Sequence, residues 1–268
     1  MPFEDDLRAV LPAHVTITSP LGTGGQGTVF LGTCNGAPAA IKVFNAATDL
    51  RRVDRECNLL RGLTCPFVVR LIEHFNVTIG VELFRIVVYE YHPGGDLSGM
   101  MLATSPLASE ADLIKIGTEI GTGVATLWGS RIVHRDIKPP NIVRAADGRY
   151  LLVDVGLARH LDLSDLTAAG GSPGTRGFRS PEQAMGRRSL TINSDVYSLG
   201  MTLFVLAARR HPFGNGDIIT PTPIDFAPLT ATRPLSAPLV KLIKQMLEFT
   251  PARRPSDLSA HFSALGGP

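Results

Sequence analysis

The spacing of hydrophobic residues changes character near residue 92. Before that point, short runs rich in apolar and β-branched residues alternate with glycine-containing turns, which is typical of antiparallel strands. The predicted strands are 15–20, 28–32, 39–44, 67–75 and 83–91. The segment 49–63 instead has apolar residues every three to four positions, which predicts one helix beside the sheet.

The pattern beyond that point is mainly helical. The clearest helices are predicted at 109–127, 193–208 and 239–248, and a proline-rich stretch at 220–238 is expected to connect the later ones. We therefore expect an α+β protein, with a small antiparallel β lobe containing one helix and a larger, mainly α lobe after it.

The composition supports a folded protein and excludes one class of function. With 268 residues, 44% of them hydrophobic, the chain can bury a large core. Its 26 basic and 24 acidic residues leave a formal charge of +2, which is too balanced for nucleic-acid binding through bulk electrostatics.

The cysteines and the N-terminal sequence indicate the cellular compartment in which the protein is expected. Cys34, Cys57 and Cys65 form no CxxC pair, which argues against a disulfide framework or a structural zinc site and favours a reducing environment. The N-terminus does not resemble a secretory signal, and no apolar run approaches the ~18 residues of a membrane span. We therefore expect a cytoplasmic protein with no membrane segment in this chain.

A glycine-rich turn at 22–29 has the sequence GTGGQGTV and lies between two predicted strands. It fits the pattern G-x-G-x-x-G-x-V, whose backbone amides can approach phosphate oxygens without side-chain obstruction. By itself the turn could equally be a tight hairpin without a ligand. A dinucleotide-binding fold is disfavoured because these glycines lead into a strand and not into a helix.

Lys42 lies within an otherwise apolar predicted strand. One interpretation is a surface lysine whose stem runs along apolar neighbours. The other is a phosphate-binding lysine held by an acidic partner, and Glu56 on the following helix is the right type of residue for that role. Glu73 and Glu82 are also near in sequence, so the pairing rests on order and spacing.

The densest group of candidate residues is the segment HRDIKPPN at 134–141. Asp136 can orient a substrate hydroxyl, Lys138 can offset developing phosphate charge, and Asn141 can offer an amide oxygen to a metal ion. Asp154, in the tripeptide DVG, follows an apolar run and can bind Mg²⁺. Alone it could be a turn aspartate, but the ordered set favours phosphoryl transfer.

With these motifs in this order, the chain resembles the eukaryotic-type (Hanks-type) protein kinase superfamily over nearly its whole length. The resemblance implies a bilobal kinase fold with an N-lobe at about 12–91, a hinge at 90–95 and a C-lobe at about 96–265. It also implies ATP as the phosphoryl donor and Mg²⁺, or Mn²⁺, as the metal cofactor. The segment SPEQ at 180–183 further resembles bacterial members of the family.

The resemblance also implies roles for individual residues. Asp136 would orient or deprotonate the acceptor hydroxyl, and Lys138 would contact the transferred phosphoryl group. The full catalytic set would be Asp136, Lys138, Lys42 and Glu56, and the metal ligands would be Asn141 and Asp154. The nucleotide-binding residues would be Leu21, Gly22, Gly24, Gly27, Val29, Ala40, Lys42, Tyr89, Glu90, His92, Asp96 and Val143. Asp96 would equally serve as the N-cap of the next helix.

Features beyond the nucleotide site indicate protein substrates. The tripeptide SPE corresponds to the family's Ala-Pro-Glu, and its Glu182 is expected to form a buried pair with Arg254. Asp195 resembles the aspartate that holds the catalytic-loop backbone. Lys138 together with Thr175 resembles the Ser/Thr-specific pattern, so the acceptor is expected to be a serine or threonine hydroxyl on a protein.

The loop after DVG is the expected site of regulation. Arg135 precedes the catalytic aspartate, so a basic pocket could bind a phosphate on this loop. The candidate acceptors are Thr167, Ser172 and Thr175. Thr175 suits substrate positioning better, so Thr167 or Ser172 is the favoured phosphosite, with ordinary polar loop residues as the alternative. Autophosphorylation is expected, through self-association that allows transfer between copies.

Two departures limit the analogy. Val155 stands where the family has phenylalanine, which removes an aromatic packing contact, and Pro140 stands where many basic-directed kinases carry glutamate.

Two rival classes of protein also share the motifs. A pseudokinase would normally lack one of four key residues, and Lys42, Asp136, Asn141 and Asp154 are all present. A small-molecule kinase is opposed by the SPE segment and by Asp195.

Overall fold

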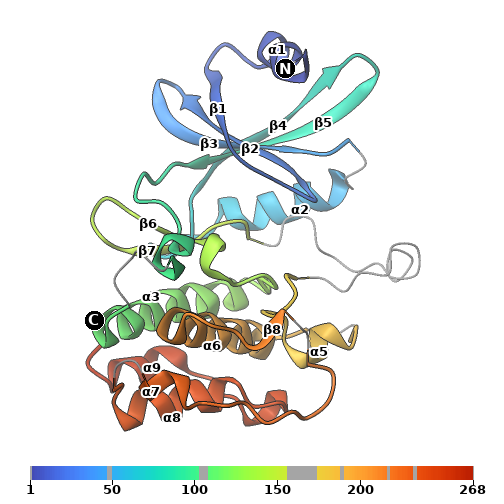
Figure 1. The fold of residues 1–268 in the computed structure, drawn as a ribbon. Coiled ribbons are helices and arrows are strands. Elements are labelled where there is room, and N and C mark those ends of the chain that lie inside the picture. Colours follow the sequence, from blue (N-terminus) through green and yellow to red (C-terminus); the bar gives the residue numbers. More distant parts are fainter. Residues whose placement is uncertain are drawn as a thin grey trace. The chain divides into compact units, whose positions relative to one another are not determined.

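The computed structural model describes residues 2–46, 50–102, 108–155, 174–187, 190–215, 218–231 and 234–267. The chain divides into two compact units, whose elements are labelled in Figure 1. The smaller unit comprises Met1–Thr64 and Val69–His92, and the larger unit comprises Cys65–Val68 and Pro93–Pro268.

The smaller unit is built on a five-stranded antiparallel sheet with the strand order β1-β2-β3-β5-β4. The strands are β1 (Val15–Gly24), β2 (Gly27–Cys34), β3 (Ala37–Phe44), β4 (Leu71–Ile79) and β5 (Glu82–Glu90). Two helices accompany them, α1 (Pro2–Val10) and α2 (Leu50–Arg61). The strands and α2 confirm the hydrophobic pattern, whereas α1, with 9 residues, is not among the predicted elements.

Two predicted strands have wrong boundaries. The strand expected at 15–20 extends to Gly24, and the strand expected at 67–75 runs from Leu71 to Ile79. Cys65–Val68 belong to the larger unit, where Val68 forms a β-bridge with Leu152 and the backbone N–H of Leu152 donates to the carbonyl oxygen of Phe67. The predicted segment 67–75 therefore contributes residues to both units. Hydrophobicity alone does not show where one unit ends.

The two faces of the sheet have different surroundings, because side chains alternate along each strand. One face packs into the hydrophobic core, to which β3 contributes Ile41 and Val43 and β5 contributes Val88. The intervening positions, including Lys42 and Tyr89, therefore lie on the opposite face.

Helices dominate the larger unit. The longer ones are α3 (Glu110–Gly129), α6 (Ile192–Ala208), α8 (Ala237–Met246) and α9 (Leu258–Ser263). The three predicted helices are confirmed to within about two residues at each end, which is the usual uncertainty of a boundary. The shorter elements are η1 (Leu97–Met101), η2 (Pro139–Asn141), β6 (Ile142–Arg144), β7 (Tyr150–Leu152), α5 (Pro181–Ala184), β8 (Pro212–Asn215), α7 (Pro228–Ala231) and η3 (Pro251–Arg253).

Helix α6 forms the centre of this unit. Every residue from 194 to 206 is buried, and the helix packs against α3 and α8. Helix α3 begins at a capping box, in which Ser109 Oγ accepts from the Asp112 N–H at 2.9 Å and Asp112 Oδ2 accepts from the Ser109 N–H at 2.8 Å. None of the helices in the described part of the chain is both long enough and apolar enough to cross a membrane.

Candidate active site

A carboxylate from α6 anchors the backbone of the predicted catalytic loop. The Asp195 Oδ2 and Oδ1 atoms accept hydrogen bonds from the backbone N–H groups of His134 and Arg135, each at 2.8 Å. Complete burial raises the pKa of Asp195, although the His134 ring and the two N–H donors oppose the rise. Arg135 has a φ of +70°, which is strained for a residue other than glycine. The expected role of Asp195 is confirmed.

Asp136 lies at the centre of a buried hydrogen-bond network. Its Oδ1 accepts from the backbone N–H of Thr175 at 2.7 Å and from Thr175 Oγ1 at 2.8 Å. Its Oδ2 lies 2.9 Å from Lys138 Nζ and accepts from Asn141 Nδ2 at 3.1 Å. Lys138 also donates to Thr175 Oγ1. The structure therefore brings together four of the residues that the sequence singles out.

Asn141 and Asp154 carry oxygen atoms suited to a hard divalent cation. Asn141 Nδ2 donates to the Asp136 carbonyl oxygen at 2.8 Å, so the side-chain oxygen of Asn141 is the atom that could bind a metal ion. The backbone N–H of Val153 donates to the Asn141 carbonyl oxygen at 3.0 Å, so Asp154 directly follows a residue tied to Asn141. An amide oxygen and a carboxylate are ligands that Mg²⁺ uses, and these residues fit the implied metal.

A buried ion pair anchors the SPE segment. Arg254 donates from Nη1 and Nη2 to the two carboxylate oxygens of Glu182 at 2.7 and 2.9 Å, and the Arg254 and Glu182 side chains are only 0% and 5% exposed. Ser194 Oγ donates to the same carboxylate at 2.8 Å. Burial raises the pKa of Glu182, but the hydrogen bonds and charge of Arg254 outweigh it and hold the pKa below its ordinary value. The predicted pair is confirmed.

Two contacts in the same region have no signal in the sequence. Gln183 Nε2 donates to the Arg135 carbonyl oxygen at 2.8 Å, and His211 Nε2 lies 2.6 Å from the Gly177 carbonyl oxygen. The first contact joins the SPEQ segment directly to the predicted catalytic loop. Gln183 and Arg135 are 48 positions apart in the sequence, and His211 and Gly177 are 34 apart. No local sequence pattern could therefore reveal either contact.

In the smaller unit, the sheet register aligns three of the predicted nucleotide-binding residues. Gly22 pairs with Val29 across β1 and β2, and Val29 pairs with Lys42 across β2 and β3. Gly27, which opens β2, has a φ of +146°, and a Cβ there would lie 1.9 Å from the Val43 carbonyl oxygen. This close backbone approach requires glycine.

Lys42 is buried and contacts the glycine-rich turn. Its Nζ donates to Gln26 Oε1 at 3.1 Å and lies 4.8 Å from the centroid of the Phe44 ring. The contact with Gln26 was not expected from the sequence. The side chain of Glu56, the predicted partner, lies outside the described residues, so that pair stays a prediction.

The remaining nucleotide-binding predictions are divided between the units. Ala40 pairs with Tyr89 across β3 and β5, and Tyr89 is buried. In the larger unit, the Asp96 carboxylate accepts from the Ser98 N–H at 2.7 Å and caps η1, as the N-cap alternative predicted. A β-bridge joins Asp96 to Val143. Leu21, Gly24, Glu90 and His92 belong to the smaller unit.

A charged cluster in the smaller unit is absent from the sequence predictions. The Arg85 side chain on β5 is buried, with Nη1 2.6 Å from Oδ1 of Asp54 on α2 and Nη2 donating to Oδ2 at 2.8 Å. Arg85 Nη1 also lies 2.9 Å from His74 Nδ1. Burial and the charges of Arg85 and Arg61 lower the pKa of His74, against the opposing charge of Asp54. The cluster fastens α2 to the sheet, and a lone arginine in the apolar run of β5 was its only signal.

Two predicted regulatory residues, Thr167 and Ser172, lie outside the described residues, as does Gly156 of the DVG tripeptide. Arg135 and Thr175 are described, and both belong to the larger unit. The structure therefore leaves the choice of phosphosite as a prediction.

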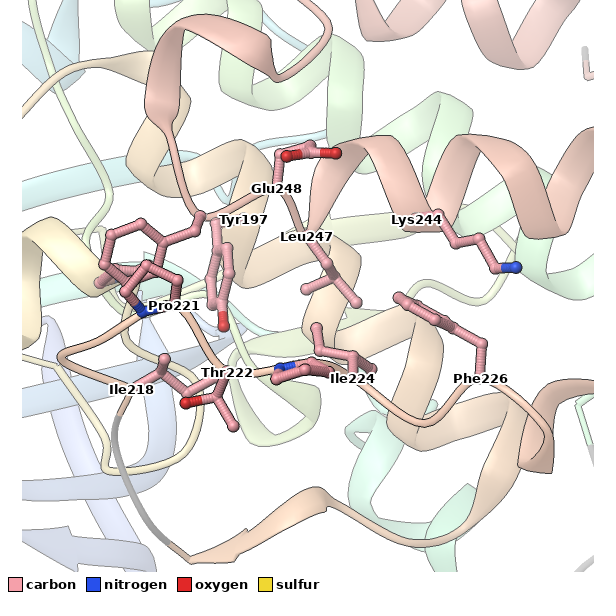
Figure 2. A pocket seen from close by; sticks show the side chains of 12 residues that line it. Tyr197, Ile218, Pro221, Thr222, Ile224, Phe226, Lys244, Leu247 and Glu248 are labelled. Carbon is pink, nitrogen blue, oxygen red and sulfur yellow. The ribbon is translucent and has the colours of Figure 1, made fainter.

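A cavity of about 510 Å³ opens elsewhere in the larger unit. Figure 2 shows its lining, which includes Tyr197 on α6, Phe226 and the end of α8 around Leu247. One wall comes from the proline-rich stretch that the sequence predicts as a connection. None of the residues predicted to bind ATP or a metal lines this cavity, so it is separate from the candidate active site.

A small β-rich unit, a larger helical unit and a hydrogen-bond network around Asp136 are the features expected of a protein kinase. The comparisons with known proteins agree with this class. A family model described as the protein kinase domain matches residues 15–263. The chain therefore belongs to the protein kinase family, as the motifs indicated.

Its relatives include bacterial proteins named as serine/threonine kinases. The chain is 31% identical over 261 residues to "Serine/threonine-protein kinases drp72" of Corynebacterium efficiens, covering 94% of this chain and 50% of that protein. It is 29% identical over 261 residues to PknA of Corynebacterium glutamicum, covering 94% and 55%. The chain thus spans about half the length of these curated relatives.

A solved structure shares the fold. The kinase domain of Mycobacterium tuberculosis PknI superimposes with a TM-score of 0.74 at 23% identity, covering 97% of this chain and 98% of that one. The expected α+β protein kinase fold is confirmed.

Proposed function

We propose that this chain transfers the γ-phosphoryl group of ATP to serine or threonine hydroxyls of protein substrates. The observation that carries the proposal is the buried Asp136 carboxylate, held between Thr175, Lys138 and Asn141 at 2.7–3.1 Å. A carboxylate positioned by several donors is poised to orient a hydroxyl and to receive its proton.

In the proposed reaction, the acceptor oxygen forms a bond to the γ-phosphorus of ATP. The bond from that phosphorus to the bridging oxygen breaks, and ADP leaves. The acceptor proton passes to Asp136. Lys138, 2.9 Å from the Asp136 carboxylate, offsets negative charge on the transferred group.

The proposed roles in nucleotide binding are as follows. Asn141 and Asp154 would hold Mg²⁺ or Mn²⁺, which when bound neutralises phosphate charge. Lys42, oriented by Glu56, and the glycines of the 22–29 turn would bind the phosphates. The rest of the ATP site would comprise Leu21, Val29, Ala40, Tyr89, Glu90, His92, Asp96 and Val143.

The Ser/Thr preference is supported by the contact between Lys138 and Thr175 and by the names of the relatives. We further propose that copies of the chain associate and phosphorylate one another at Thr167 or Ser172. A phosphate there would bind the basic Arg135 side chain through charge-assisted hydrogen bonds. The cytoplasm is the proposed location.

The test is transfer from γ-labelled ATP to a generic protein substrate with Mg²⁺, followed by identification of the labelled amino acid. Wild-type protein should label serine or threonine, and Asp136→Asn should reduce the rate by about 10²–10⁴-fold. Asp225→Asn, at an exposed ion pair with Arg210, is the matched control and should retain the wild-type rate. Equal labelling by wild type and Asp136→Asn would refute the assignment.

Autophosphorylation has its own test. Mass spectrometry of protein incubated with Mg²⁺ and ATP should find phosphate on Thr167 or Ser172. Wild-type protein should also label an Asp136→Asn copy, because transfer occurs between copies. If the Asp136→Asn copy is not labelled, phosphate transfer between copies is refuted. The proposed activity on other protein substrates is not affected by that result.

A further inference from the structure

A second cluster of reactive side chains lies in the smaller unit, among residues that the kinase reaction does not use. His14 Nε2 is 2.8 Å from Glu73 Oε1, and the Cys34 thiol donates to the same oxygen at 3.4 Å. The ligand atoms of these three residues all lie within 4.8 Å of one another. The cluster therefore gathers a nitrogen, a sulfur and an oxygen donor at one point.

Backbone pairing holds His14 and Cys34 close together. Val15 pairs with Cys34 across β1 and β2, and the Asn35 N–H donates to the His14 carbonyl oxygen at 2.8 Å. Asn35 and Gly36 have φ values of +51° and +78°, as in the two-residue turns that favour Asn-Gly. Cys34 thus lies at the base of a tight hairpin.

Glu73 lies on β4, which stands at the opposite end of the strand order from β1. The β4–β5 register shifts between Leu71 and Glu73, which marks a bulge at that point. Bulges bend a strand and re-aim its side chains. The Glu73 carboxylate is only 30% exposed and meets the buried Cys34 thiol.

The chemistry of this donor set suits a transition metal, because zinc binds cysteine sulfur, histidine nitrogen and carboxylate oxygen. A zinc ion would displace the thiol proton to solvent and bind the Cys34 thiolate. One thiolate, one carboxylate and one neutral imidazole balance its double charge.

The distances are also compatible with a tetrahedral site. Zinc binds nitrogen and oxygen at about 2.0–2.2 Å and sulfur at about 2.3 Å, so neighbouring ligand atoms in a tetrahedron are about 3.3–3.7 Å apart. The Cys34–Glu73 separation of 3.4 Å lies within that range, the His14–Glu73 separation of 2.8 Å is shorter, and all three ligand atoms lie within 4.8 Å of one another. His14 would bind through Nε2 and keep its proton on Nδ1.

We propose that His14, Cys34 and Glu73 form a site for one zinc-type transition-metal ion, with water as the fourth ligand. The ion would tie the segment between α1 and β1 to the β2–β3 hairpin and to β4. Mg²⁺ would not compete, because hard cations prefer oxygen ligands to thiolate.

The test uses the whole chain, freed of metal by a chelator and kept in excess Mg²⁺ without nucleotide. Zn²⁺ is titrated in competition with a chromogenic chelator, and Co²⁺ is added separately for absorption spectroscopy. We expect one Zn²⁺ per chain, and with Co²⁺ a thiolate charge-transfer band together with the intense visible bands of tetrahedral cobalt.

The variants are Cys34→Ser, His14→Ala and Glu73→Gln, with Cys65→Ser as the control that removes a more accessible thiol. Each of the three should weaken Zn²⁺ binding by at least about a hundredfold, because loss of even an outer partner typically costs about 10–100-fold. Cys65→Ser should bind as wild type does. Circular dichroism verifies folding, and if Cys34→Ser unfolds, the other two variants decide.

Wild-type protein that binds no Zn²⁺ would overturn the proposal. So would binding that survives both His14→Ala and Glu73→Gln, or a cobalt spectrum without a thiolate band. None of these readouts involves phosphate transfer, so the result is independent of the proposed kinase activity.

Discussion

Glu182 and Asp136 are both buried carboxylates in the larger unit, and each meets a cation, yet their surroundings differ. Glu182 accepts hydrogen bonds from Arg254 and Ser194, and Arg254 is itself held by three backbone carbonyl oxygens, those of Asn193, Glu248 and Phe249. Asp136 instead meets the hydroxyl of Thr175 and the half-buried Lys138.

The difference shows how one type of side chain can serve the fold in one place and chemistry in another. The partners of Glu182 cannot be exchanged without leaving a buried charge or a buried carbonyl unpaired, which is costly. The hydroxyl that contacts Asp136 could give way to a substrate hydroxyl of the same kind. We therefore expect changes at Glu182 to act on stability and changes at Asp136 to act on rate.

The largest stability effect is expected from Arg254→Ala. It leaves the Glu182 carboxylate buried without its cation, and breaking such a pair typically costs about 3–5 kcal/mol. Urea unfolding followed by circular dichroism measures the loss. Arg210→Ala, which removes a pair whose side chains are 61% and 62% exposed, should cost at most about 1 kcal/mol. Equal losses in the two variants would contradict the distinction.

A smaller effect is expected from Asp195→Asn. An amide can accept from only one of the two N–H groups of His134 and Arg135, so one buried donor loses its partner at a cost of about 1–3 kcal/mol. Phosphate transfer should also slow, because the catalytic loop loses its position. Urea unfolding and the transfer assay measure the two effects, and a variant that keeps both at the wild-type level would show that α6 does not anchor the loop.

Thr175→Ala should affect stability less, by about 1 kcal/mol for the lost hydroxyl contacts with Asp136 and Lys138. The transfer rate should fall by about tenfold, equivalent to about 1.4 kcal/mol. Thr175→Ser keeps the hydroxyl and is the matched control, which should preserve most of the rate. A serine variant as slow as the alanine variant would assign the effect to the methyl group.

The smallest effect is a difference in acid stability. The pKa of Glu182 is held below its ordinary 4.5, so the unfolded chain binds the proton first as the pH falls. The stability from this group is therefore complete above about pH 4.5 and is lost as the pH falls through the lower, folded value. Asp195, with its raised pKa, has the opposite slope, so the comparison must be with Glu182→Gln.

Urea midpoints measured between pH 3 and pH 6 check this prediction. Wild-type stability should fall more steeply with acid than that of Glu182→Gln. Parallel curves would mean that Glu182 does not titrate as the ion pair requires.

Much of the site could be predicted from sequence because its residues lie in short ordered motifs. The segment from His134 to Asn141 holds Asp136, Lys138 and Asn141 within eight positions, so spacing indicated these three members of the network, whereas Thr175 came from the resemblance. The Glu182–Arg254 pair and the role of Asp195 came from the resemblance to a known family. The periodic helices, such as α3, were also legible because long regular patterns are the most reliable.

The remainder depends on contacts between distant residues. The Arg85–Asp54 pair joins residues 31 positions apart, and the His14–Glu73 contact spans 59. Neither produces a local pattern. The predicted start of strand β4 is too early because Phe67 and Val68, which precede it, belong to the larger unit. Only tertiary structure shows which core an apolar residue joins.

The most direct test of the central claim compares the phosphate-transfer rate per folded molecule of Asp136→Asn and Glu182→Gln. The folded fraction of each is first measured by urea unfolding at the assay temperature. Asp136→Asn should lose about 10²–10⁴-fold in rate while remaining folded. Glu182→Gln should lose stability but stay within about tenfold of the wild-type rate per folded molecule. An equal loss of rate in both variants, or an undiminished rate in Asp136→Asn, would contradict the account.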